Sequence, residues 1–531
     1  MRRRIALLAV VGTVTAAIGC LPPRGGKVER MEDTKPVALY WTTSRDVDRL
    51  DLAHMGASLR ARHPGEEARA IAAWRYVRRT MFHYPMRNES HTDKFDAAKL
   101  VNVYGYSFCT QQGVTAAALA KAAGLKSRVI GVPGHGMYEV QYGGGWHAFC
   151  TTSGFFVRTR AEDRHIASMD EMKADPTLVT KARVEGRAGE PFLPCAGGPE
   201  ILGEKEGTKE CPYALTYRHY DEKFFVAGAK KWKSLGAPNP SRHAVWVPLR
   251  RGESLRLEWA AAETYVPPKI AERFWPPRHL CGAKDKANPF FPELAPYGRK
   301  VKGRVTYRYP GRGVHVWRPR LEGSGALASL AVAENVRASR GSLAPLDASK
   351  PAVAEFEVTG PYVYVDGAVE GTTHLGEGGS LRLLFRGTDP DVPWEEIHSA
   401  ARGERALNIR LGERVQPTRP ADKKKARAYT RYRFRVRVEM RGEAALSEFV
   451  LRGRVQHNWC ALPQLVPGRN EIELRVKEKR VPPGASFALA WDERGQVRIL
   501  RRRVRKTREH IAVRVKSAAM PRMRSVTFTR E

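Results

Sequence analysis

The chain has 531 residues, of which 42% are hydrophobic and 28% are charged, and it carries a formal net charge of +35. This length exceeds what one hydrophobic core fills, so about three or four domains are expected, and aromatic residues along the whole length exclude a wholly disordered chain. The charge favours anionic partners, such as an anionic surface or an acidic polymer. Its dispersal along the chain also fits arginines on solvated strand faces.

Residues 1–20 have the pattern of an export signal. Three arginines at positions 2–4 precede an apolar run over residues 5–18, which is too short to span a bilayer comfortably. The run ends at Cys20, in a segment that resembles the lipobox of bacterial lipoproteins, where the cysteine is acylated. Removal of the signal leaves a net charge of +32. We therefore expect an exported protein of the cell envelope, anchored to the membrane by a lipid on Cys20; the alternative is a soluble exported protein.

Seven cysteines are distributed along the chain: Cys20, Cys109, Cys150, Cys195, Cys211, Cys281 and Cys460. Export permits disulfides, and Cys195 and Cys211 bracket a segment rich in glycine, glutamate and lysine. A bridge between these two cysteines would staple a domain junction. Neither a C-x-x-C pair nor a metal-finger spacing occurs, so the cysteines predict no metal site and no cofactor.

Residues 21–45 contain paired prolines and paired glycines and are expected to form a tether. An α+β domain is predicted over residues 46–195. Its helices are expected over residues 67–80, where apolar residues recur at helical spacing with arginines opposite, and over residues 109–123, followed by Gly124 as a C-cap. Short strands are expected over residues 127–132, 137–142 and 146–150, and a run of glycines joins the last two in a hairpin.

The remainder of the chain has the pattern of β structure. Strict alternation over residues 432–440 predicts a strand, and similar runs cover residues 244–248, 254–259, 354–358 and 380–385. A polar stretch over residues 404–428 is a linker or a long loop, and the basic residues 501–508 fit a solvated strand or loop. The predicted fold is therefore multidomain: the α+β domain, then all-β, sandwich-like modules over residues 205–345, 346–410 and 425–531.

Cys109 stands at the predicted start of a helix, with Ser107 as a candidate N-cap. A helix N-terminus stabilises a thiolate and points backbone N–H groups at whatever the sulfur attacks. A buried structural cysteine would occupy the same position equally well. The position alone is therefore compatible with either a nucleophilic or a structural cysteine.

The segments that follow Cys109 carry a resemblance: GLKSRV over residues 124–129, GHGMYEV over residues 134–140 and GW at residues 145–146. Over residues 55–160 the chain resembles the transglutaminase-like family of the papain-like cysteine protease superfamily. In that family a helix-starting cysteine precedes an Arg-Val strand, a His-x-x-x-Glu-Val strand and a Trp-bearing strand. The resemblance implies that Cys109 is the nucleophile and His135 its general base. It also implies acyl transfer at amide bonds of a protein or peptide substrate, either as peptide or isopeptide hydrolysis or as crosslinking of glutamine to an amine.

The chain departs from this family pattern at one position. The family has an aspartate four residues after the tryptophan, and this chain has Cys150 there. Three hypotheses follow: a Cys–His enzyme assisted by Thr151, Thr152 or another carboxylate; a pseudoenzyme that binds peptide or glycan in the cell envelope; or a metal site or disulfide formed among Cys109, His135, His147 and Cys150. Nucleic acid is not expected as a partner, because no recognised binding module accompanies the charge.

Overall fold

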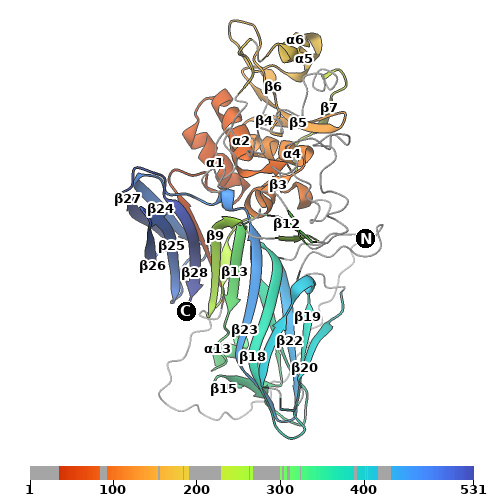
Figure 1. Ribbon diagram of the computed structural model, residues 1–531, viewed down its shortest axis with the longest axis vertical. Helices are drawn as coiled ribbons and strands as arrows, with labels where there is room; N and C mark the ends of the chain where they lie inside the picture. The colour runs from red at the N-terminus through yellow and green to blue at the C-terminus, as the bar shows by residue number, and fades with distance from the viewer. Residues whose placement is uncertain are drawn as a thin grey trace, which may run out of the picture.

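The computed structural model describes residues 35–83, 93–152, 156–182, 185–189, 229–261, 264–266, 299–301, 304–307, 311–322, 324–387, 392–400, 402–403, 405–415 and 432–531. The fold is mostly β-sheet, with several sheets and few helices, as expected for sandwich-like modules (Figure 1). Among the described residues, none of the helices has the length and apolar character needed to cross a membrane.

The longer helices gather in the N-terminal part of the chain, around a small sheet with the order β6-β5-β4-β7 (Figure 1). Helices α2 and α4 agree with the predicted helices, and Gly124 takes a φ of 89° where α4 ends. Gly143 and Gly144 both have positive φ and form the two-residue turn of the β5–β6 hairpin. The elements of this part are α1 (Leu52–Arg62), α2 (Glu66–Thr80), β2 (Phe82–His83), η2 (Asp93–Phe95), α3 (Ala97–Lys99), η3 (Leu100–Tyr104), β3 (Tyr106–Ser107), α4 (Cys109–Ala122), β4 (Lys126–Val132), β5 (His135–Tyr142), β6 (Gly145–Phe149), α5 (Met169–Ala174) and α6 (Thr177–Thr180).

The fourth strand of this sheet comes from beyond the expected domain end at residue 195. Strand β7 (Lys233–Gly236) pairs antiparallel with β4, and Gly131 faces Lys233. Ala229 and Trp232 pack with a small hydrophobic core that includes Ile130, Met137 and Ala148 of β4, β5 and β6. The α+β unit therefore extends to residue 236, because a later segment supplies its edge strand.

The expected tether over residues 21–45 contains a buried strand. All seven residues of β1 (Val37–Thr43) are buried, and β1 pairs with β8 (Val247–Leu249) on one side and with β24 (Gly468–Val476) on the other. Pairing of Val37 with Leu249 brings the two ends of the α+β unit together. The α+β unit is thus an insertion between two neighbouring strands of a sheet, and a tether that reaches residue 45 is wrong.

The described residues of the β region form three larger sheets and one small three-stranded sheet with the order β10-β12-β11. A ten-stranded sheet has the path β15-β16-β23-β13-β9-β28-β25-β26, with β18 on β23 and β21 on β18. A four-stranded sheet has the order β27-β24-β1-β8, and a five-stranded sheet has the order β14-β17-β22-β19-β20. The other elements of this region are β9 (Glu253–Ala261), β10 (Thr264–Val266), β11 (Arg299–Val301), β12 (Arg304–Tyr307), β13 (Gly311–Trp317), α13 (Ser324–Ala328), β14 (Val332–Glu334), β15 (Val336–Ser339), β16 (Ser342–Pro345), β17 (Ala352–Thr359), β18 (Val363–Leu375), β19 (Ser380–Arg386), β20 (Glu395–Ala400), β21 (Ala406–Arg410), η4 (Gly412–Arg414), β22 (Arg433–Arg441), β23 (Ala444–His457), η5 (Trp459–Ala461), β25 (Ala485–Glu493), β26 (Gln496–Arg503), β27 (Arg508–Val515) and β28 (Arg522–Arg530).

The four-stranded and the five-stranded sheets pack against the ten-stranded sheet through large aromatic side chains. In one sandwich, Trp41 of β1 lies with its ring centroid 6.0 Å from that of Trp259 and 5.7 Å from that of Phe487. In the other, the ring centroids of Phe356 and Trp317 are 5.6 Å apart. Strands of the ten-stranded sheet come from all three expected modules, so the boundaries near residues 345 and 410 do not separate sheets.

The predicted alternation over residues 432–440 produces strand β22. Phe434, Val436, Val438 and Met440 are fully buried against the ten-stranded sheet, while the arginines between them point away from the core. The period of two thus fixes which face of the strand is buried.

A buried polar junction joins the α+β unit to the β region. Asn458, just before η5, donates from Nδ2 to the carbonyls of Thr80 and Val101, 2.7 and 2.5 Å away. Its backbone N–H donates to the carbonyl of Asn102 at 2.8 Å. Asn102 in turn accepts a hydrogen bond from buried Arg49 at 3.2 Å. The β region therefore holds the segment 100–104, which precedes β3 and the helix that begins at Cys109.

Candidate functional site

Cys109 is the first residue of α4 and is half-buried. Its N-cap is Phe108, in an extended conformation, and the Phe108 N–H donates to the side chain of Gln111 at 2.9 Å. The expectation that Ser107 caps this helix is wrong, because Ser107 lies one residue too early, in the short strand β3. Gln111 also donates to the Lys94 carbonyl at 2.8 Å, so the helix start is anchored to the preceding segment.

The start of α4 lies directly against the start of β5. A Cβ atom on Gly136 would stand 2.5 Å from Cα of Thr110, and one on Gly113 would stand 2.9 Å from the carbonyl oxygen of Met137. Only glycine fits at such short separations. The two glycines therefore bring Cys109 next to the strand that carries His135.

Donor groups around the start of α4 influence the pKa of the Cys109 thiol. They are the backbone N–H groups of Gly136, Thr110 and Cys109 itself and the hydroxyl of Thr110. Burial raises the pKa of the Cys109 thiol above its ordinary value, and these donors lower it without cancelling that effect. The helix start therefore prepares a place for negative charge, while the thiol itself rests protonated at neutral pH.

His135 contacts Cys150. Its Nε2 atom lies 3.1 Å from Sγ of Cys150, and both side chains are buried. Burial lowers the pKa of His135 to about 3, so the imidazole is neutral at neutral pH. Cys150, four residues after Trp146, is thus the side chain that lies beside the imidazole.

The residues that follow β6 are fixed by α2 and α4. The indole N–H of Trp74 donates to the Cys150 carbonyl at 2.9 Å, and Arg78 donates to the Thr151 and Thr152 carbonyls at 2.9 and 3.1 Å. The Thr152 hydroxyl donates to the side chain of Gln112 at 3.1 Å. These contacts hold Cys150 in place, and the hydroxyl of Thr152 is directed at Gln112.

Arg78 was expected on the solvated face of its helix, and the structure places it inside with 1% of its surface exposed. Its guanidinium lies 5.9 Å from the ring centroid of Trp74. The sequence could have indicated this burial, because Arg78 follows the apolar Trp74 by four positions and therefore lies on the same face of the helix. The role of Gln112, one turn into α4, had no comparable signal.

A structural cluster surrounds Arg128. Arg128 of β4 pairs with the fully buried carboxylate of Glu139 at 2.5 Å. Its guanidinium lies 4.0 Å from the ring centroid of Trp146 and 4.9 Å from that of Trp232. Glu139 also accepts from the Met169 N–H at 2.8 Å. This cluster holds β4, β5 and β6 together. It thereby helps to fix the positions of His135, which begins β5, and of Cys150, which follows β6.

His147 does not join the cysteines. One ring nitrogen faces the carbonyl of Ile166, and the other lies 3.0 Å from the carbonyl of Tyr142. Cys109 and Cys150 are free thiols rather than a disulfide. Within the described ranges, no cluster of three or more histidine, cysteine, aspartate or glutamate side chains could hold a metal ion. Cys20, Cys195 and Cys211 lie outside the described residues.

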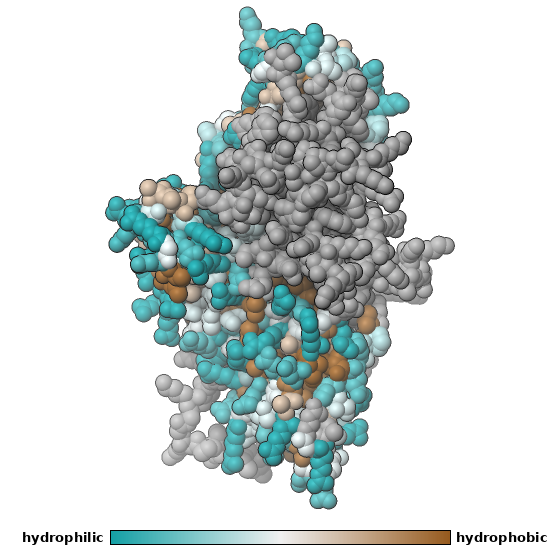
Figure 2. Space-filling view, in the orientation of Figure 1, coloured by the Kyte–Doolittle hydropathy of each residue, from teal (hydrophilic) through white to brown (hydrophobic). Residues whose placement is uncertain are grey.

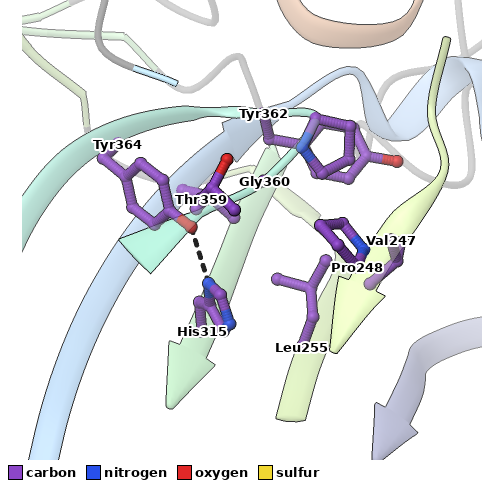
Figure 3. Close-up of a pocket in the computed structure, with 10 residues that line it drawn as sticks. Val247, Pro248, Leu255, His315, Thr359, Gly360, Tyr362 and Tyr364 are labelled. Atoms are coloured by element: carbon purple, nitrogen blue, oxygen red, sulfur yellow. Dashed lines mark hydrogen bonds between the residues drawn. The ribbon is translucent and has the colours of Figure 1, made fainter. Parts of the chain in front are cut away.

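A small cavity lies far along the chain from this site, at the seam between the two sandwiches. It is lined by Pro248, Leu255, His315, Tyr362 and Tyr364 among others, and its volume is about 10 Å³ (Figure 3). The Nδ1 atom of His315 lies 2.6 Å from the hydroxyl of Tyr364. A cavity of this size holds about one water molecule and no larger ligand.

The arrangement around Cys109 combines a thiol, an array of N–H donors and a strand that carries a neutral imidazole. These are the groups that nucleophilic attack on a carbonyl requires. No model of a known protein family matches the chain, and no curated protein matches it.

Proposed function

We propose that the α+β unit is a transglutaminase-like, papain-like domain that performs acyl transfer at amide bonds. Cys109 would be the nucleophile and His135 the general base. The observation that carries this proposal is the close approach of Gly136 to Thr110, because it sets the sulfur of Cys109 against the residue next to His135. The order of helix, His-bearing strand and Trp-bearing strand supports the same assignment.

The reaction would begin from neutral groups. His135 takes the proton of Cys109 as the sulfur attacks the amide carbon, and the N–H groups at the start of α4 stabilise the negative charge that develops. The C–N bond then breaks, the amine leaves with the proton held by His135, and a thioester on Cys109 remains. Water completes a hydrolysis of a peptide or isopeptide bond, and a second amine completes a crosslink to glutamine.

The Cys150 thiol would hold the imidazole of His135 in position through the contact at Nε2. A neutral thiol does this less effectively than a carboxylate, because it does not stabilise the imidazolium that forms during attack. In a serine triad, disturbing the equivalent hydrogen bond costs about 10⁴ in rate. We infer a slow enzyme rather than a fast one.

A second candidate function follows from the same contact. With Cys150 in the carboxylate position and the His135 pKa lowered to about 3 by burial, the unit would act as a pseudoenzyme that binds peptide or glycan. In either case we propose an exported envelope protein, anchored through a lipid on Cys20, that meets protein or peptide partners or an anionic surface outside the cytoplasm.

Trapping of the thioester separates the two candidates. The purified protein is incubated with glutamine-containing peptides, quenched in acid and analysed by intact mass and peptide mapping. An acyl adduct on Cys109 that is absent from Cys109→Ala and reduced in His135→Ala supports acyl transfer. Saturable peptide binding without an adduct, retained in Cys109→Ala, supports the pseudoenzyme and contradicts acyl transfer.

A further inference from the structure

Strand β26 forms one edge of the ten-stranded sheet. It pairs antiparallel with β25 through all eight of its residues, from Gln496 facing Glu493 to Arg503 facing Ser486. Within the described part of the chain, no strand pairs with its other side. Alternate backbone N–H and C=O groups along β26 are therefore turned to solvent, which is the template onto which another strand adds.

Two apolar side chains lie exposed on this strand. Val497 and Ile499 are 48% and 49% exposed. They point to the face opposite Leu500, which packs against the core. In the space-filling view, the surface where β25 to β27 lie is mainly hydrophilic and encloses a small hydrophobic patch (Figure 2). The edge therefore offers apolar contacts in addition to its backbone groups.

Arginines on other strands face carboxylates across the sheet. Arg437 of β22 pairs with Glu355 at 2.5 Å, Arg452 of β23 with Glu370 at 2.6 Å, and Arg524 of β28 with Asp492 at 2.7 Å. Sheets of this protein thus place an acidic residue on the neighbouring strand within reach of these arginines, directly opposite for Arg437 and diagonally for Arg452 and Arg524.

One arginine of β26 has such a neighbour, because Arg498 lies 3.7 Å from a carboxylate oxygen of Glu493, but the last three arginines of the strand lack one. Arg501, Arg502 and Arg503 are exposed, and they face Ala488, Phe487 and Ser486 on β25. None of the three forms an ion pair with a residue that the structure describes. Arg501 and Arg503 point to one face of the strand and Arg502 to the other. The guanidinium groups of Arg501 and Arg503 therefore repel each other, and a partner that supplies carboxylates would relieve the repulsion.

We propose that β26 is a docking edge for an extended acidic peptide segment of a partner protein, which adds to the ten-stranded sheet as a further strand. The partner would place acidic residues opposite Arg498, Arg501, Arg502 and Arg503 and apolar residues opposite Val497 and Ile499. Main-chain hydrogen bonds hold the segment, and the alternating side chains select it. This surface is independent of the function proposed for Cys109.

An anionic polymer or lipid headgroup would use only part of this edge. It would pair with the guanidinium groups and leave the backbone edge and the two apolar side chains exposed. The combination of an open edge, apolar residues and unpaired arginines in one strand favours a peptide. Arginines on an edge strand can also prevent pairing with another chain. If that is their role in β26, no peptide binds.

The test uses fluorescein-labelled peptides with the sequence Glu-Glu-Glu-Val-Val-Glu-Val and its reversal, so that both strand directions are covered. Binding to the purified full chain is measured by fluorescence anisotropy, and amide hydrogen exchange is followed over residues 494–505. We expect saturable binding by one of the peptides and protection of alternate amides in β26. An N-methylated peptide of the same sequence, which keeps the charges but lacks backbone donors, should bind about tenfold more weakly.

The charge-reversed variant Arg501→Glu/Arg503→Glu should lose about tenfold or more in affinity. The matched control is Arg469→Glu/Arg514→Glu, which reverses two exposed arginines that face each other on β24 and β27. It should bind like the wild type. Absence of binding, equal binding of the N-methylated peptide, equal loss in both variants, or equal competition by phosphatidylglycerol vesicles would each overturn the proposal.

Discussion

Nε2 of His135 lies 3.1 Å from Sγ of Cys150, and both side chains are buried. The transglutaminase-like assignment that we propose would place a carboxylate next to this imidazole, and this chain has a thiol there. A neutral thiol orients the ring through one hydrogen bond but adds no negative charge to stabilise an imidazolium. No negative charge therefore counteracts the effect of burial, which lowers the pKa of His135 to about 3.

The substitution Cys150→Asp tests the importance of that missing charge. A carboxylate at this position, beside Nε2, should raise the pKa of His135 and increase the alkylation rate of Cys109 near neutral pH by about tenfold or more. The rate of carbamidomethylation, measured by mass spectrometry, checks this. Cys150→Ser keeps a neutral hydrogen-bonding group and should leave the rate near that of wild type. Equal rates in Cys150→Asp and Cys150→Ser would show that charge at this position does not control the site.

Gly136→Ala should separate the helix start from β5. The added Cβ would stand 2.5 Å from Cα of Thr110, so backbone must move, at a cost of about 1–3 kcal/mol in the free energy of unfolding. The alkylation rate of Cys109 in Gly136→Ala should therefore differ from that of the wild type.

Gly131→Ala is the control, since Gly131 pairs with Gly136 across β4 and β5. Its Cβ would meet only the flexible side chain of Leu235, at 3.3 Å. Urea titrations should find a clearly smaller loss of stability for Gly131→Ala, and an equal loss would contradict the packing described for Gly136.

His135 should make the protein less stable in acid. Its pKa of about 3 in the folded state is below the ordinary value of 6.5, so between these pH values the unfolded chain binds a proton that the folded chain does not. Stability contributed by neutral His135 is therefore lost as pH falls from 6.5 towards 3, by up to about 1.4 kcal/mol for each pH unit. His135→Gln should flatten the decline of the unfolding free energy over this range. An identical slope in His135→Gln and in the wild type would contradict this role of His135.

Asn458→Ala should uncouple the two parts of the molecule. The change removes the donors to the Thr80 and Val101 carbonyls and leaves those buried groups unsatisfied, at a cost of about 2–4 kcal/mol. We expect a lower melting temperature, and Cys109 should become easier to alkylate as the segment before α4 loosens. Asn335→Ala, which removes hydrogen bonds from an Asn to carbonyls in a more exposed turn, is the control and should have the smaller effect. Equal effects would argue against the junction as a special support.

Local elements could be predicted from the sequence because their signals are local. Helical spacing marks α2, glycines at positive φ mark the end of α4 and the β5–β6 hairpin, and alternation marks β22. The position of Cys109 at the start of a helix follows from the same kind of pattern. These features depend on neighbours within a few residues.

Long-range pairing could not be predicted in this way. Nothing within β1 indicates that it lies between β8 and β24, about 200 and 430 residues away along the chain, and nothing within β7 indicates that it completes the sheet of His135. The contact of Cys150 with His135 depends on such tertiary placement too. Family resemblance suggested that contact, but residue spacing alone did not.

The alkylation rate of Cys109 across pH is the most direct measurement of the central claim. Wild type, His135→Ala and Cys109→Ala are treated with iodoacetamide from about pH 5 to about pH 9, and each cysteine is followed by peptide mapping. Our account predicts that Cys109 of wild type reacts near neutral pH about tenfold or more faster than in His135→Ala, because His135 accepts the thiol proton. In His135→Ala, reactivity should appear only at alkaline pH, as burial raises the pKa of Cys109. Identical profiles with and without His135 would contradict a Cys109–His135 catalytic pair.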